Sequence, residues 1–500
     1  MMKLSVAPQD AWQPLPPGDW NADAARHLLR RSGWTARPAD VERAVSEGLS
    51  ATIDRLFPAS PTLFPEPAMV ANFAEAAPAY VQRIRTAPPE DRRLLQREQR
   101  ERAQATLTNM TVRWMQFASQ AENSAIEKWV LFLSDIYVVS FEKVYNPPLI
   151  FKHFDILARH ALGPAPELTK AVSRSPAMMI YLDLNQNQKK APNENFAREL
   201  FELFLLGEGN YTEADIKQAA RAFTGYRTRP AFGDVILVDN QHDDGEKTVF
   251  GETGNYNGDD VIDAAYRQPA AGAFLPHEMV KFYLSDTMLP RDYLYGLGSA
   301  WSSEGEYSLR WLARRFFASR IFFAPEFRGE FIKSPVQFYL GLLQDLSLDV
   351  APVPRFIVGP LRQMGQILYQ PPNVRGWVGG RNWINSATLA ARRTMTESAF
   401  TAIDEDALNA DEQVEIVAAR LNGADRFTVS DQSLRSFAGM TPEAAVSHFT
   451  SILLAKPPMP AFTAALSDFI AQGPAEPAQR MHRLRRAIAT LLEAPEYQLC

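Results

Sequence analysis

A long segment of this chain, residues 89–120, contains no glycine or proline after its first position, and this limits the folds that the chain can adopt. The segment is rich in Arg, Glu, Gln and Leu, which favour helix, so one extended α-helix is predicted. Shorter helical patterns lie on both sides of it. They predict helices that begin near Asn21, at Pro38 and at Pro176, and helices that cover residues 125–140 and 151–160.

One segment interrupts the helical patterns. Two short apolar runs, residues 235–238 and 247–250, are predicted to be the two arms of a small β-hairpin, because turn-forming residues separate them. The expected fold class is therefore all-α, a multi-helix globular protein with one small β-hairpin insertion. We expect an extended N-terminal arm over residues 1–20, a main helical domain over 21–400 with the hairpin near 232–252, and a C-terminal helical subdomain over 401–500.

Charge and composition exclude several classes of protein. The formal net charge is −6, which argues against a nucleic-acid binder that depends on clustered Lys and Arg. Arginine runs do occur at residues 92–102 and 480–486, but they alternate with Glu, Gln or Leu and are interpreted as solvated helix faces. No nucleic-acid partner is expected.

The sequence also limits the compartment and the redox chemistry. Cys500 is the only cysteine, so neither an internal disulfide nor a thiolate-rich metal site can form. The N-terminal residues contain no apolar segment typical of a signal peptide. The longest apolar stretch, residues 129–139, is interrupted by Ser134 and Asp135 and is too short to span a bilayer. A cytoplasmic protein without a membrane span is expected.

The strongest candidate site is a polar arc on the helix predicted over residues 193–206. In a helical projection its charged residues fall beside Phe201 and Leu205, so this arc is predicted to pack against another element. The next helix, over residues 212–224, begins with a capping box at Thr212 and ends at Gly225. It adds an arginine to the cluster. The candidate catalytic residues are Glu194, Arg198, Glu199, Glu202 and Arg221.

Two interpretations of this cluster stay open. It is either a carboxylate-rich site for general acid–base work or cation binding, or an ion-pair network that fixes helix packing. Glu194 and Arg198 have the favourable i,i+4 order, and Glu202 is expected to reach the same guanidinium.

A loop near residue 380 supplies a second candidate site. Tryptophan rings combined with amide and guanidinium donors suit a sugar or another polyhydroxylated ligand; the alternative is a rigid loop whose amides satisfy its own backbone. The candidate ligand-binding residues are Asn373, Arg375, Trp377, Arg381, Trp383 and Asn385.

His242 and Asp243 are weaker candidates for a divalent metal. The same Asp-rich sequence is also typical of a plain turn. Zinc motifs, a phosphate-binding P-loop, a dinucleotide fingerprint and a serine nucleophile elbow are all absent from the sequence.

Two long motifs carry a family resemblance. The first is APNENFARELFELF at residues 191–204, with AARAFTG at 219–225; the second is PPNVRGW at 371–377, with WINSATL at 383–389. Together with shorter matches near residues 29–34, 242–248 and 332–335, they resemble the bacterial "domain of unknown function 1800" family over the whole chain. The resemblance implies a helical fold but no activity. Relatives often carry Trp-His-Asn-His-Phe where this chain has residues 133–137, Leu-Ser-Asp-Ile-Tyr, so those two histidines are absent here.

The functional expectation is therefore a ligand-binding or enzyme-like helical protein of this uncharacterised family. The alternative is a non-catalytic partner or scaffold. The resemblance implies a candidate partner for that role, a protein of the "domain of unknown function 1501" family, which resembles sulfatases and phosphatases and is commonly encoded nearby.

Overall fold

The computed structural model describes residues 4–229, 233–473 and 476–500. The long predicted helix is present as α5, and its predicted span is confirmed to within two residues. Asn21 caps the first helix by accepting hydrogen bonds from the main-chain N–H groups of Asp23 and Ala24. The N-terminal helices are α1 (Ala22–Ser32), α2 (Pro38–Glu47), α3 (Leu49–Leu56), α4 (Ala68–Thr86) and α5 (Pro89–Ala118).

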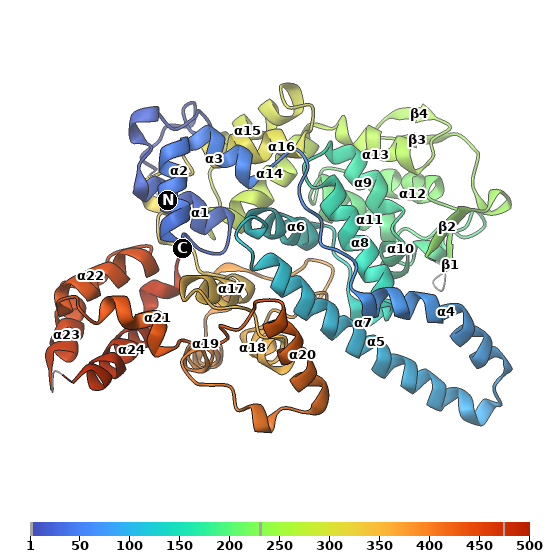
Figure 1. Ribbon diagram of the computed structural model, residues 1–500. Helices are drawn as coiled ribbons and strands as arrows, with labels where there is room; N and C mark the ends of the chain where they lie inside the picture. Colours follow the sequence, from blue (N-terminus) through green and yellow to red (C-terminus); the bar gives the residue numbers. More distant parts are fainter. Residues whose placement is uncertain (1–3, 230–232, 474–475) are drawn as a thin grey trace.

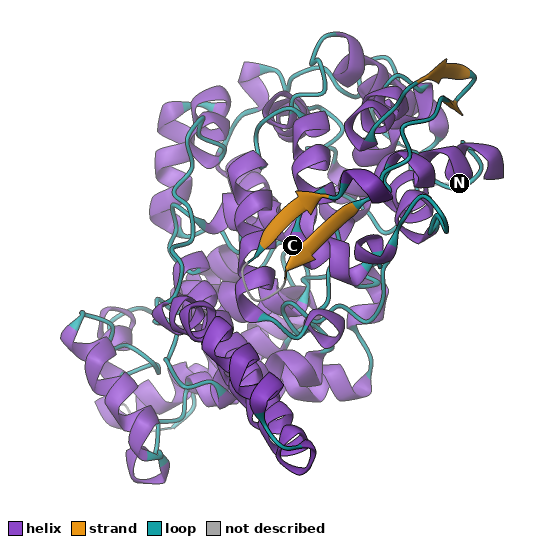
Figure 2. Cartoon of the chain, turned by 90° about the vertical axis from the view of Figure 1, so that its right-hand side faces the viewer, coloured by secondary structure: helices purple, strands orange, loops and turns teal. Residues whose placement is uncertain are grey.

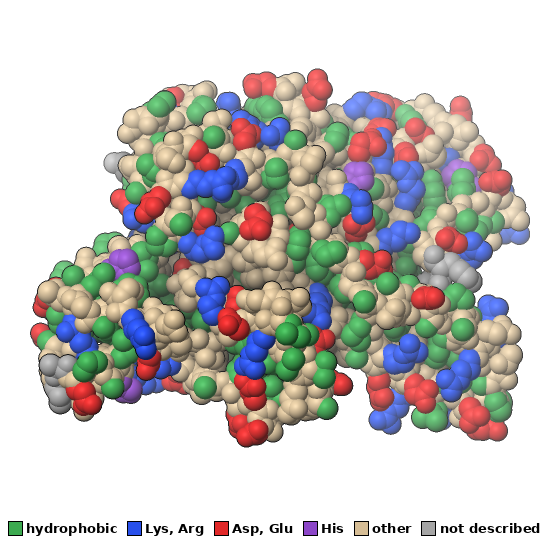
Figure 3. Space-filling model, in the orientation of Figure 1, with side chains coloured by type: hydrophobic (Ala, Val, Ile, Leu, Met, Phe, Trp, Pro, Cys, Tyr) green, Lys and Arg blue, Asp and Glu red, His purple; other side chains and the backbone are tan. Residues whose placement is uncertain are grey.

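Helices α4 and α5 form an antiparallel pair whose far end extends away from the body of the molecule (Figure 1). The far end carries the first of the two arginine runs. Figure 3 shows acidic and basic side chains interspersed there, and Arg97 pairs with Glu101 at 2.8 Å. These exposed i,i+4 pairs contribute little to folding.

The middle of the chain supplies most of the buried helices. The predicted helices at residues 125–140, 151–160 and from Pro176 correspond to α6, α8 and α10. The helices are α6 (Ser124–Ile136), α7 (Phe141–Val144), α8 (Pro147–His160), α9 (Ala165–Ser173), α10 (Pro176–Tyr181), α11 (Asn195–Glu199) and α12 (Glu213–Ala222). The predicted capping box of α12 is confirmed, because Thr212 and Asp215 each accept a hydrogen bond from the other's backbone N–H.

The predicted pairing of the β-hairpin is wrong, although the fold class is confirmed. Strand β1 (Tyr226–Arg229) pairs with β2 (Asp234–Leu237), and β3 (Lys247–Val249) pairs with β4 (Glu252–Gly254), in two separate antiparallel hairpins (Figure 2). Phe250 and Gly251 both have positive φ, at 51° and 81°, which is the geometry of a two-residue hairpin turn. The Asp-rich segment between β2 and β3 connects the two hairpins and is held against α12 instead of forming a turn.

The remaining helices complete the body and the C-terminal part. The first group is α13 (Gly258–Tyr266), α14 (Pro269–Tyr283), α15 (Arg291–Ser303), α16 (Leu309–Ala318), α17 (Pro335–Asp345), α18 (Arg355–Met364) and α19 (Ser386–Ala399). The second group is α20 (Ala410–Leu421), α21 (Asp431–Leu434), α22 (Pro442–Leu453), α23 (Pro460–Ala471) and α24 (Pro477–Glu493).

A large apolar core runs through the molecule and includes buried residues from Ala11 to Tyr497. A smaller apolar cluster, Val353, Leu408 and Ile416, lies beneath α20. The division into an arm, a main domain and a C-terminal subdomain stays a prediction. Among the residues that the structure describes, no helix has the length and apolar character needed to cross a membrane.

Candidate functional site

The polar arc predicted on one α-helix lies on a helix that changes type. Residues 195–199 form α11, but Leu200–Leu205 form a π-helix, η3, in which the carbonyl of Phe201 accepts hydrogen bonds from the main-chain N–H groups of Leu206 and Gly207. A π turn holds more residues than an α turn and therefore rotates the side chains that follow it. A projection that assumes 3.6 residues per turn therefore does not hold across residues 200–205.

Arg198 and Glu202 do not meet, so the expectation that they share an ion pair is wrong. The Arg198 guanidinium lies 2.6 Å from Glu213 and 3.3 Å from Glu194. These three side chains are partly or largely exposed and form a surface ion-pair group. Because solvent screens these charges, the contribution of this group to stability is expected to be small.

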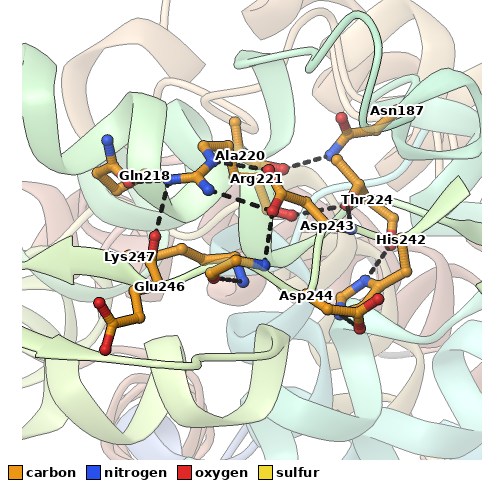
Figure 4. A network of polar contacts seen from close by, with 11 residues as sticks. Asn187, Gln218, Ala220, Arg221, Thr224, His242, Asp243, Asp244, Glu246 and Lys247 are labelled. Carbon is orange, nitrogen blue, oxygen red and sulfur yellow. Dashed lines mark hydrogen bonds and ion pairs between the residues drawn. The ribbon is translucent and has the colours of Figure 1, made fainter.

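Arg221 belongs to a different group, shown in Figure 4. Its guanidinium contacts both carboxylate oxygens of Asp243, at 2.7 and 3.1 Å, and also Gln218 at 2.6 Å. The hydrogen bond from Arg221 lowers the pKa of Asp243. This network attaches the end of α12 to the segment that joins the two hairpins.

His242 lies beside this network. Its Nδ1 is 2.8 Å from the carbonyl oxygen of Thr224, so Nδ1 carries a proton because a carbonyl only accepts. Its Nε2 is 3.9 Å from Asp244. Within the described ranges of the chain, no group of three or more His, Cys, Asp or Glu side chains is close enough to hold a metal ion. The geometry around His242 and Asp243 therefore favours a structural role.

Glu202 instead meets the second long motif. Arg375 lies 2.7 Å from Glu202 and 2.8 Å from Glu208, and the hydroxyl of Tyr211 donates to Glu202 at 3.0 Å. Glu199 is half-buried nearby, and burial, followed by the charge of Glu202, raises its pKa. The two motifs that carry the family resemblance therefore come together at this point.

An outer cavity of about 850 Å³ opens beside this contact. Helices α6, α14 and α15, the π-helix η3 and the loop at residues 374–375 supply its walls. This volume is in the range of small-molecule sites, which combine apolar walls with a few polar groups. The apolar walls include Leu203, Leu206, Phe274, Met288, Leu294, Tyr295 and Val374. The polar groups include Asp135, Glu202, Glu208, His277, Glu278, Lys281, Arg291 and Arg375.

A smaller inner chamber of about 80 Å³ adjoins the outer cavity and shares part of its lining, including Asp135, Glu278 and Lys281. Trp377 and Trp383 line this chamber. Lys128 also lines it; its ammonium group donates to the carbonyls of Arg31 and Gly33, and burial lowers its pKa to about 7. We call the outer cavity and the inner chamber together the cleft.

Asp135 lies where the two spaces join. Its carboxylate accepts a hydrogen bond of 2.8 Å from the main-chain N–H of Trp377. Burial raises the pKa of Asp135 from 3.8 to about 7, and the Trp377 hydrogen bond only partly opposes this effect. At neutral pH this carboxyl is therefore present in both protonation states, which is what general acid–base chemistry requires.

Two glycines let the 373–385 loop approach two carboxylates. A Cβ on Gly376, whose φ is +75°, would lie 2.0 Å from Oδ1 of Asp135. A Cβ on Gly380, whose φ is +64°, would lie 2.3 Å from the carboxylate of Asp286, which accepts a hydrogen bond from the main-chain N–H of Arg381. The loop therefore fixes both carboxylates with backbone groups.

The remaining loop residues support the loop itself. Asn373 accepts a hydrogen bond from the main-chain N–H of Arg375 at 2.8 Å, and Asn385 caps α19. The Arg381 side chain is exposed and does not line the cleft. Of the six predicted loop residues, Arg375, Trp377 and Trp383 line the cleft.

Two buried glutamines complete the inner chamber. Gln337 and Gln366 line it and are only 2% and 3% exposed. Gln337 Nε2 donates to the carbonyl of Arg30, and Gln366 Oε1 accepts from Val336 N. Within the described residues, Gln337 Oε1, Gln366 Nε2 and the indole N–H groups of Trp377 and Trp383 have no hydrogen-bond partner. The chamber therefore offers both donors and an acceptor.

Sequence reasoning missed several residues of the cleft. Asp135 carried two signals, because it interrupts the longest apolar stretch of the chain and lies in the segment 133–137 where relatives carry histidines, but neither signal predicted a site at Asp135 itself. The other missed residues, including His277, Glu278, Lys281, Gln337 and Gln366, carry no local motif.

A pH-dependent prediction follows from Asp135. Its pKa is higher in the folded protein than the ordinary value of 3.8, so folding favours the protonated carboxyl, and this stabilisation is lost as pH rises from about 4 to about 7. Asp135→Asn keeps the acceptor for Trp377 but does not ionise. The variant is expected to be more stable than wild type at pH 8, by about 2–4 kcal/mol, and close to it at pH 4.

Urea unfolding at pH 4, 6 and 8 measures this difference. At each pH, the free energy of unfolding of wild type is subtracted from that of the variant. The contributions of the other titrating groups cancel in this difference, so its change with pH reports on Asp135. A difference that stays constant from pH 4 to pH 8 would contradict the raised pKa of Asp135.

Comparison with known proteins identifies the family. The family model described as "Protein of unknown function (DUF1800)" matches residues 27–499. Neither a curated protein nor a solved structure matches the chain. Because the match covers nearly the whole sequence, the predicted resemblance is confirmed, and the chain belongs to the DUF1800 family of proteins of unknown function.

Proposed function

We propose that this protein binds a small polyhydroxylated organic ligand in the cleft, with its hydroxyl groups in the inner chamber. The observation that carries the proposal is the set of hydrogen-bonding groups on residues that line the inner chamber and that have no protein partner among the described residues: Gln337 Oε1, Gln366 Nε2 and the indole N–H of Trp383. A few polar groups in a mostly apolar pocket are what orients a small ligand. A hydroxyl both donates and accepts, so it can pair with the donors and the acceptor of this chamber.

The surroundings favour a polyhydroxylated ligand over a strongly charged one. Arg375 is paired with Glu202 and Glu208, and Lys281 is paired with Glu278 at 2.7 Å. These cations are therefore largely neutralised. The Trp377 and Trp383 rings add apolar faces of the kind that stack on sugar rings.

Asp135 extends the proposal from binding to chemistry. It lines both the inner chamber and the outer cavity, so a ligand that crosses from one to the other passes its carboxyl. With a pKa of about 7, this carboxyl can give or take a proton at a ligand hydroxyl near neutral pH. An enzyme-like role with Asp135 as general acid–base is therefore part of the proposal.

Ligand-observed NMR with glycerol, erythritol, xylitol, glucose and myo-inositol tests the proposal. We compare wild type with Trp383→Phe, which keeps the aromatic face but loses the indole N–H. Trp311→Phe is the matched control, because it makes the same chemical change on α16, away from the cleft. At least one polyol is expected to bind saturably to wild type and to the control, and about five- to tenfold more weakly to Trp383→Phe.

If no polyol binds, or if Trp383→Phe binds as tightly as wild type, the proposal is wrong. The scaffold interpretation would then be the next one to test. The exposed apolar face of α20, formed by Val414, Val417 and Leu421, is the feature that favours it.

A further inference from the structure

A third cavity, separate from the cleft, lies between α1 and α22. Its volume is about 410 Å³, and it shares no lining residue with the cleft. One face of α1 supplies Asp23, Arg26, His27 and Arg30, and the loop before α17 supplies Arg328. Lys456 follows α22. Four cationic side chains and one acidic side chain, Asp23, therefore line this cavity.

Arg30 is the central group of this cavity. It is only 5% exposed, and its Nη2 donates to the carbonyl of Ile452 at 2.8 Å. Its Nε and Nη1 have no hydrogen-bond partner, and no carboxylate lies within 4.0 Å of its guanidinium, in the part of the chain that the structure describes. The charge of Asp345 offsets part of the cost of burying Arg30, and an anion in the cavity would add direct hydrogen-bond partners for Nε and Nη1.

The neighbouring cations have partners of their own. Arg26 is paired with Asp23 at 2.7 Å, and Lys456 is paired with Glu330. Arg328 uses Nε to donate to the carbonyl of Phe323 at 2.9 Å. Burial lowers the pKa of Arg30 more than the negative charges at Asp345 and Cys500 raise it.

The opposite wall carries hydroxyl groups. Ser447, Thr450 and Ser451 lie at helical spacing on α22 and all line the cavity. Thr450 and Ser451 donate to main-chain carbonyls of their own helix, whereas the hydroxyl of Ser447 has no partner among the described residues and is available to donate. Guanidinium groups facing a free hydroxyl are typical of phosphate recognition.

We propose that this cavity binds the phosphate group of a small phosphate-bearing molecule, with Arg30 and Arg328 as its principal contacts and Ser447 as an additional donor. A cavity of about 410 Å³ is larger than a phosphate ion alone. Leu454, Ala455 and Pro457 line its remainder and provide an apolar surface for the rest of the ligand. This site is independent of the proposed function of the cleft.

Isothermal titration calorimetry with inorganic phosphate and with glycerol 3-phosphate, at constant ionic strength, tests this proposal. Because replacing buried Arg30 risks unfolding the protein, the variants are Arg328→Gln, which removes a partly exposed cation, and Ser447→Glu, which places a carboxylate in the cavity. Arg393→Gln is the matched control: it makes the same charge change on an exposed arginine of α19 that pairs with Glu397.

We expect saturable binding of at least one probe to wild type and to Arg393→Gln. Binding is expected to be at least about tenfold weaker in Arg328→Gln and absent in Ser447→Glu. Tighter binding of glycerol 3-phosphate identifies the ligand as a phosphate ester, and equal binding identifies free phosphate. No saturable binding to wild type, or equal affinity in Arg328→Gln and Arg393→Gln, overturns the proposal.

Discussion

Gly376→Ala is expected to lower the free energy of unfolding by about 3–5 kcal/mol. Two effects combine at this position. The residue has a φ of +75°, which is strained for any residue with a Cβ, and the added Cβ would lie 2.0 Å from Oδ1 of Asp135 and 3.0 Å from its main-chain oxygen. The loop would have to move away from α6, and the hydrogen bond from Trp377 N to Asp135 would be lost.

Gly379→Ala is the matched control in the same loop. Gly379 has a φ of −75°. The atom nearest to a Cβ added at this position is Trp383 Nε1, at 3.6 Å. Its effect is expected to stay within about 0.5 kcal/mol. Chemical denaturation of both variants measures the contrast. Equal stabilities would show that the close approach of the loop to Asp135 is not what holds the cleft together.

Gly298→Ala is expected to lower the free energy of unfolding by about 3 kcal/mol. Helices α14 and α15 cross at Gly272 and Gly298, and a Cβ on Gly298 would lie 2.5 Å from the carbonyl oxygen of Gly272. Because the obstructing atoms belong to the backbone, the two helices would have to separate. Both helices line the outer cavity, so the same substitution is expected to weaken ligand binding there.

Gly296→Ala, on the same helix, is expected to raise the free energy of unfolding instead of lowering it. Its added Cβ would meet only Trp12 Cδ1, at 3.6 Å, so the substitution improves helix propensity and gains about 0.5–1 kcal/mol. Thermal and urea unfolding of both variants measure the pair. If both substitutions change stability in the same direction, the close crossing of α14 and α15 is not the cause.

Local patterns predicted the helices well because helix formation depends on residues close in sequence. The long segment without glycine or proline became α5, and Thr212 and Asp215 form the predicted capping box. Strand pairing depends on partners that local patterns do not identify. The run at Val235 was correctly predicted as a strand, yet its partner is β1 and not residues 247–250.

The candidate site shows the same limit. Both family motifs were found in the sequence, but the contact between Glu202 and Arg375 joins residues 173 positions apart. The π-helix that contains Glu202 has no recognisable sequence signal. Nothing in the sequence distinguishes Gln337 and Gln366 from other glutamines. Tertiary packing places them beside the inner chamber. Of the residues that line the cleft, the sequence-based candidates include Glu202, Arg375, Trp377 and Trp383, and tertiary packing brings the others there.

A high-resolution crystal structure of the protein soaked with the polyol that binds best tests whether the inner chamber holds a polyhydroxylated ligand. We expect ordered ligand density in the inner chamber, with ligand hydroxyls within hydrogen-bond distance of Gln337 Oε1, Gln366 Nε2 and the Asp135 carboxyl. A chamber without ligand density, in which those two amides hydrogen-bond to other protein groups, would show that the cleft is not a polyol site.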